Sequence, residues 1–93
     1  MAAETLHLRI KGRVQGVGFR YWVRRNAEQL HLTGWVRNRR DGTVEALFAG
    51  EKPDVDEMCA RCAAGPPGAN VTLVETIQEG GMAPETFEIL PVK

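Results

Sequence analysis

The sequence predicts an α+β fold in which two helices cover one face of an antiparallel sheet. Several short stretches alternate apolar and polar residues, the period of a strand, and two longer stretches repeat apolar residues with the period of a helix. Along the chain they follow the order strand, helix, strand, strand, helix, strand, with one further short strand at the end. Placing both helices on one face of the sheet is the simplest way to bury their apolar sides, and it predicts a ferredoxin-like split β-α-β sandwich.

In the first half of the chain, Leu6, Leu8 and Ile10 alternate with polar residues and indicate a strand. A helix follows a glycine-rich loop, and Asp41-Gly42 lies between two strand-like runs, which is typical of a hairpin. The predicted elements are a strand over 5–11, a helix over 19–30, and strands over 35–39 and 43–49.

In the second half, Pro53 is suited to the first turn of a helix. The helix ends at Gly65-Pro66-Pro67-Gly68, and strands follow over about 71–78 and 87–89. The apolar side of this helix comprises Val55, Met58, Cys59, Cys62 and Ala63.

Length and composition bound the class of protein. A chain of 93 residues predicts a single domain over 1–93 with one two-layer core. Apolar residues make up 43% and charged residues 26%, as in ordinary globular proteins. No apolar run approaches the roughly 20 residues of a membrane helix, and the first residues do not resemble a signal peptide. We therefore expect a cytoplasmic monomer with no membrane partner.

The loop between the first strand and the first helix is suited to bind an anion. Glycine allows positive φ and close approach of the backbone, so that successive N–H groups can surround a ligand. The start of the helix adds free N–H donors and the positive end of its dipole, and Arg20 can hold two oxygens of one phosphate. A turn without a ligand is the structural alternative, and the spacing matches neither common nucleotide motif. The candidate residues are Gly12, Arg13, Val14, Gln15, Gly16, Val17, Gly18, Phe19 and Arg20.

Asn38 lies where the second predicted strand ends. A right-handed β-α-β crossover brings this strand end, the glycine-rich loop and Arg20 to the same edge of the sheet. The Asn38 amide can donate and accept hydrogen bonds, so it could hold a water molecule or a substrate oxygen. An asparagine beside a turn often only satisfies the backbone, but its convergence with the loop favours a functional role.

The spacing Cys59-Ala60-Arg61-Cys62 also occurs in redox and metal sites. Both cysteines fall on the apolar side of a helix interior, away from the helix N-terminus where reactive thiolates usually lie. A structural zinc site needs four ligands, and His7 and His31 are distant in sequence. We expect core thiols, no disulfide and no metal site.

Charge is unevenly distributed along the chain. Residues 1–40 contain nine of the twelve lysines and arginines against two acids, a net charge of +7 that residues 41–93 balance. This pattern suits the steering of a small anion and leaves nucleic acid possible. RNA-binding sheets of this topology stack bases on aromatic side chains, but only 6% of the residues are aromatic. The central strands offer Leu6, Leu8, Ile10, Val44, Ala46 and Phe48, and we expect no nucleic-acid partner.

Four segments together resemble the acylphosphatase family. They are 12–20, Gly34-Trp35-Val36-Arg37-Asn38, Asp41-Gly42-Thr43-Val44 and 65–69, and the resemblance extends from about Leu6 to Ile89. It implies hydrolysis of the carboxyl-phosphate anhydride of small acyl phosphates to carboxylate and inorganic phosphate, without metal or cofactor.

The resemblance also implies roles for individual residues. The loop from Gly12 to Gly18 would hold the phosphoryl oxygens, Arg20 would clamp them, and Asn38 would orient the attacking water. No pair of carboxylates and no triad accompanies the loop, which suits a reaction with a good leaving group. The alternative is a non-catalytic anion-binding or regulatory module on the same fold.

Overall fold

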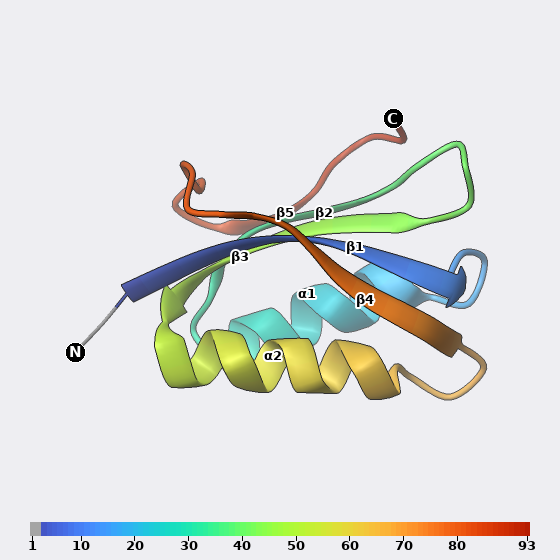
Figure 1. Cartoon of the computed structure of the whole chain (residues 1–93), viewed down its shortest axis with the longest axis horizontal. Helices are drawn as coiled ribbons and strands as arrows, with labels where there is room; N and C mark the ends of the chain where they lie inside the picture. The colour runs from blue at the N-terminus through green and yellow to red at the C-terminus, as the bar shows by residue number, and fades with distance from the viewer. Residues whose placement is uncertain (1–2) are drawn as a thin grey trace.

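The structure is a computed structural model that describes residues 3–93. The predicted order of elements is confirmed, and most bounds agree to within two residues (Figure 1). The first strand is longer than predicted at both ends and includes Gly12 and Arg13. The elements are β1 (Ala3–Arg13), α1 (Phe19–Gln29), β2 (Thr33–Asn38), β3 (Val44–Glu51), α2 (Lys52–Ala64), β4 (Asn70–Glu79) and β5 (Phe87–Ile89).

The strands form one sheet in the order β4-β1-β3-β2-β5, and both helices lie on the same side of it (Figure 1). Neighbouring strands among β1 to β4 pair antiparallel, as predicted, whereas β5 runs parallel to β2 and makes the sheet mixed. β4 is one edge strand and β5 is the other, and β4 ends at the end of the sheet where β2 begins. The chain crosses between them through residues 80–86, so it enters β5 in the direction of β2.

The core lies between the sheet and the helices. Leu8, Ile10 and Phe48 are fully buried on the inner face of the sheet, against Val23 of α1 and Met58 of α2. The six strand residues considered above for RNA binding therefore all belong to the core. The outer face instead holds His7, Arg9, Trp35, Arg37 and Glu45.

The loop after β1 and the turn between β2 and β3 lie at the same end of the sheet, where α1 also begins (Figure 1). This is the arrangement that the right-handed crossover predicts. Neither helix within residues 3–93 is long and apolar enough to span a membrane.

Candidate active site

A pocket opens at this end of the sheet, and three segments build it. The loop after β1 forms one wall, the first turn of α1 a second, and the end of β2 a third. Arg20 and Asn38, predicted to converge, line the same pocket. The lining residues are Val14, Gln15, Gly16, Gly18, Phe19, Arg20, Tyr21 and Asn38.

The loop is anchored at both ends and open in the middle. The side chains of Val14 and Phe19 are buried in the core. Between them, Gly16 and Gly18 adopt left-handed conformations, with φ of 74° and 75°, which glycine adopts without strain. Gly18 caps α1 without a side-chain hydrogen bond, and the first turn of the helix contains no acidic residue. The exposed backbone at a helix start therefore suits an anion.

Three predicted loop residues do not line the pocket: Gly12, Arg13 and Val17. Gly12 and Arg13 belong to β1. At Gly12, with φ of 125°, a Cβ would lie 2.1 Å from the backbone oxygen of Asn70 in β4. The close approach of β4, rather than a ligand, explains the glycine at this position.

Asn38 is the last residue of β2. Its backbone oxygen accepts a hydrogen bond from the N–H of Lys93 at 3.0 Å. Its side-chain Oδ1 is buried and has no hydrogen-bond partner among residues 3–93. Buried polar atoms are nearly always paired, and Asn38 also lines the pocket, so its amide is a candidate hydrogen-bonding group for a ligand or a water molecule.

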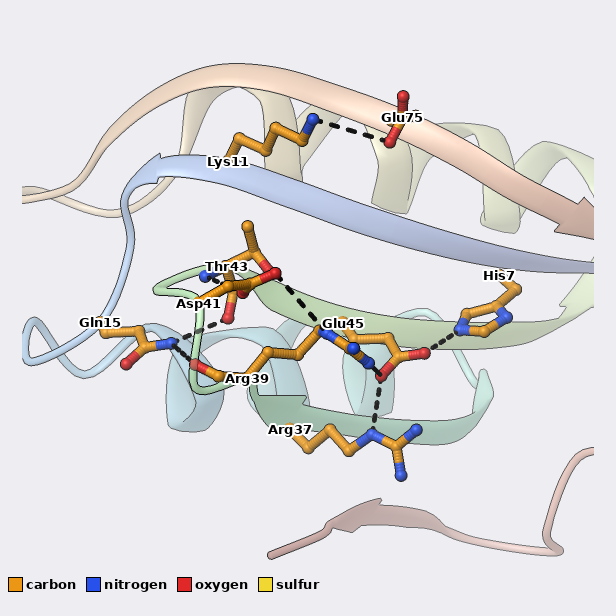
Figure 2. Close-up of polar contacts among 9 residues, drawn as sticks. All are labelled: His7, Lys11, Gln15, Arg37, Arg39, Asp41, Thr43, Glu45 and Glu75. Carbon is orange, nitrogen blue, oxygen red and sulfur yellow. Dashed lines mark hydrogen bonds and ion pairs between the residues drawn. The ribbon is translucent and has the colours of Figure 1, made fainter. Parts of the chain in front are cut away.

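The side chain of Gln15 points to the turn between β2 and β3. Its Nε2 donates to the backbone oxygens of Arg39, at 2.7 Å, and Thr43, at 2.8 Å (Figure 2). The sequence marks Gln15 as part of the loop but contains no local signal for this contact, because its acceptors lie 24 and 28 residues further along the chain.

On the outer face, Glu45 is the centre of a charged cluster that sequence analysis missed (Figure 2). Its Oε1 accepts from Arg37 Nε at 2.8 Å and from Arg39 Nη1 at 2.9 Å, and its Oε2 contacts His7 Nε2. Burial opposes ionisation of the carboxyl, but the hydrogen bonds from Arg37, Arg39 and His7 outweigh it and lower the pKa of Glu45 to about 2. Two arginines of the basic half are thus paired with a carboxylate rather than free for an anion.

Tyr21 is a pocket residue that sequence analysis also missed. It follows Arg20 on α1, the residue is 56% exposed, and the Arg24 guanidinium carbon lies 5.9 Å from the ring centroid. An exposed aromatic residue of the pocket lining is suited to an apolar contact with part of a ligand.

The two cysteines lie on the side of α2 that packs against the core. Cys62 is fully buried and Cys59 packs against the core. Burial raises the pKa of Cys59 to about 11 and that of Cys62 further, because an apolar environment disfavours the thiolate. Among residues 3–93 no three His, Cys, Asp or Glu side chains are grouped so that they could hold a metal ion.

The chain is similar in sequence and in structure to known proteins of one family. The sequence model of the acylphosphatase family matches residues 6–89. The chain is 64% identical over 66 residues to an acylphosphatase of Nitrobacter hamburgensis, covering 71% of this chain and 67% of the relative. It is 47% identical over 97 residues to an acylphosphatase of Bradyrhizobium diazoefficiens, covering 98% of each. The crystal structure of acylphosphatase from Bacillus subtilis superposes with a TM-score of 0.86 at 34% identity, covering 96% of this chain and 99% of that one.

The fold and pocket define a small α+β domain in which a glycine-rich loop, an arginine and an asparagine line one pocket. With the matches to sequence and structure, the chain belongs to the acylphosphatase family. It is an enzyme that hydrolyses acyl phosphates, and a non-catalytic binding module is not favoured.

Proposed function

We propose that this pocket hydrolyses small acyl phosphates without a metal ion, with the backbone of residues 14–18 and Arg20 holding the phosphoryl group and Asn38 orienting the water. The observation that carries the proposal is the buried, unpaired Oδ1 of Asn38 in the wall that faces the loop and Arg20. The amide of Asn38 can donate and accept hydrogen bonds, and in this pocket it would orient the attacking water beside the bound phosphoryl group.

The phosphoryl group would bind where the loop meets α1. Its oxygens would accept from backbone N–H groups of the loop and the first helical turn, whose donors are not capped by a side chain. The Arg20 guanidinium would add two parallel donors and a positive charge. These groups would stabilise the charge that moves onto the phosphate and leaving-group oxygens in the transition state.

The reaction would need no protein base. The water oxygen forms a bond to phosphorus as the bond between phosphorus and the acyl oxygen breaks, and the carboxylate leaves with the bonding electron pair. We propose that the water proton passes to a phosphate oxygen of the substrate. A carboxylate is a good leaving group, so positioning and charge stabilisation carry most of the catalysis.

We further propose that the chain works as one cytoplasmic domain and as a monomer, without nucleic acid. Its exposed large apolar residues are spread over α1, β4 and the last loops rather than gathered in one patch, which supports a monomer. On the outer face of the sheet, the arginines Arg37 and Arg39 are paired with Glu45, which argues against a polyanion there. The exposed large apolar residues comprise Tyr21, Leu73, Ile77, Met82 and Val92.

Hydrolysis of benzoyl phosphate in the presence of a chelator tests the proposal. Arg20→Ala should lower kcat/KM by on the order of a hundredfold or more, and Arg20→Lys should recover little, because an ammonium cannot form the two-donor fork. Arg25→Ala is the matched control, since Arg25 is an exposed arginine of the same helix outside the pocket. Loss of turnover with chelator, or an Arg20→Lys variant close to wild type, would contradict the proposal.

A further inference from the structure

Gln15 makes two contacts that its place in the anion loop does not require. Its Nε2 donates to the carbonyl oxygens of Arg39 and Thr43, at 2.7 and 2.8 Å (Figure 2). The same two carbonyls already pair within the turn, because Thr43 accepts from the N–H of Arg39 and Arg39 accepts from the N–H of Gly42. The Gln15 amide therefore adds a long-range contact to a turn that closes by itself.

These contacts use all the donors that the side chain has. A primary amide carries two N–H bonds, and in Gln15 each has a backbone acceptor. The side chain has no donor left for a phosphate oxygen. Its backbone N–H is the one donor of Gln15 that remains for a phosphate oxygen, so the side chain has a different task from the backbone of the loop.

The turn that Gln15 holds is itself well braced. Asp41 Oδ1 accepts from the backbone N–H of Thr43 at 3.0 Å and from its hydroxyl at 2.6 Å. The side chain of Arg39 is held by Glu45 (Figure 2). Gln15 thus holds the loop against a turn that has several hydrogen bonds of its own.

The turn between β2 and β3 begins next to Asn38. The sheet alone does not connect Asn38 to the loop. The loop follows β1 and Asn38 ends β2, and β3 lies between these two strands. The loop that would bind the phosphoryl oxygens is therefore attached to β1, whereas Asn38, which would hold the water, belongs to β2. These two strands do not pair with each other. Gln15 bridges them, since Arg39 directly follows Asn38.

We propose that Gln15 is a positioning residue: its side-chain amide holds the phosphate loop against the β2–β3 turn and so sets the distance between the bound phosphoryl group and the water on Asn38. This inference rests on the proposed function. An error of about 1 Å in such a distance can lower a rate about a hundredfold, while the loop and Arg20, which follow one another in the chain, still bind phosphate.

The variant Gln15→Met tests this, because it keeps the length of the side chain and removes both donors. We would measure kcat with benzoyl phosphate and the inhibition constant of inorganic phosphate, with Gln78→Met as control. Gln78 is an exposed glutamine of β4 outside the pocket. In Gln15→Met we expect kcat to fall roughly tenfold to a hundredfold, with the phosphate inhibition constant changed less than about threefold; the control should match wild type. If Gln15→Met does not fold, Gln15→Asn, which retains the amide on a shorter stem, is measured by the same criteria.

A double variant shows whether Gln15 acts through Asn38. In the Asn38→Ala background, Gln15→Met should lower kcat by no more than about twofold, because residues that act as a unit are not additive. A double variant in which the two losses in kcat multiply in full would overturn the proposal. So would a Gln15→Met variant whose phosphate inhibition constant rises while kcat stays unchanged, or one in which neither value changes. Wild-type turnover in Asn38→Ala alone would instead contradict the proposed role of Asn38, and with it the reason for the bridge.

Discussion

Replacing Glu45 with glutamine should destabilise the protein strongly at neutral pH. The substitution keeps the shape of the side chain but removes the charge that faces Arg37, Arg39 and His7 on the outer face of the sheet. The side chain of Glu45 is only 5% exposed, so solvent does little to replace the lost interactions. Breaking a buried charge pair by removing one partner typically costs about 3–5 kcal/mol.

The pKa of Glu45 gives a second measure of the loss. A carboxyl whose pKa is about 2 in the folded protein, against an ordinary value of 4.5, contributes about 3 kcal/mol to the free energy of unfolding at neutral pH. Because the folded-state pKa is lowered, this contribution is complete above pH 4.5 and is lost as the pH falls through about 2. The difference between wild type and Glu45→Gln should therefore be about 3 kcal/mol at pH 7 and shrink to roughly half at pH 3.

Urea denaturation of both proteins from pH 7 to pH 3 measures this difference. Glu75→Gln is the matched control, because it removes a carboxylate from an exposed ion pair. Glu75 Oε1 lies 3.9 Å from Lys11 Nζ, and both side chains are more than 40% exposed (Figure 2). It should change stability by less than about 1 kcal/mol. A Glu45→Gln variant as stable as wild type at pH 7, or a difference that grows as the pH falls, would refute the reasoning.

Three further predictions follow. Gly34→Ala should lower the free energy of unfolding, measured in urea, by more than about 1 kcal/mol. The reason is that φ of Gly34 is 138° and a Cβ would lie 1.8 Å from the Leu47 backbone oxygen; a variant as stable as wild type would contradict this. Cys59 and Cys62 should react with a thiol reagent at pH 8 only on unfolding, because burial raises the pKa of both, and rapid labelling of the native protein would count against it. Tyr21→Ala should reduce the preference for benzoyl over acetyl phosphate roughly threefold to tenfold, because Tyr21 lines the pocket and is 56% exposed, and an unchanged ratio of kcat/KM would exclude a contact between the ring and the acyl group.

The fold was predictable because its signals are local. Alternation in β1, the Asp41-Gly42 turn and the Pro53 helix start each depend on a few adjacent residues. The handedness of the crossover then brings Arg20 and Asn38 to one pocket. The parallel direction of β5 was not predicted, because it depends on where the chain crosses the sheet rather than on the three residues of the strand.

The side-chain contacts were not predictable in the same way. Glu45 contacts a residue 38 positions away in the sequence, and Gln15 contacts residues 24 and 28 positions away. Such pairs depend on strand register, where a shift of one residue reverses the face. Gly12 was expected to serve the ligand, but its close approach to Asn70 arises from an irregularity in the pairing of β1 with β4.

The most direct test of the central claim separates binding from turnover at Asn38. Calorimetry would measure the Kd of inorganic phosphate for wild type and Asn38→Ala, alongside kcat for benzoyl phosphate. If the loop and Arg20 hold the phosphoryl group and Asn38 holds the water, the variant should bind phosphate within about threefold of wild type while kcat falls by on the order of a hundredfold. Turnover retained in the variant, or phosphate binding lost together with turnover, would contradict that division of roles.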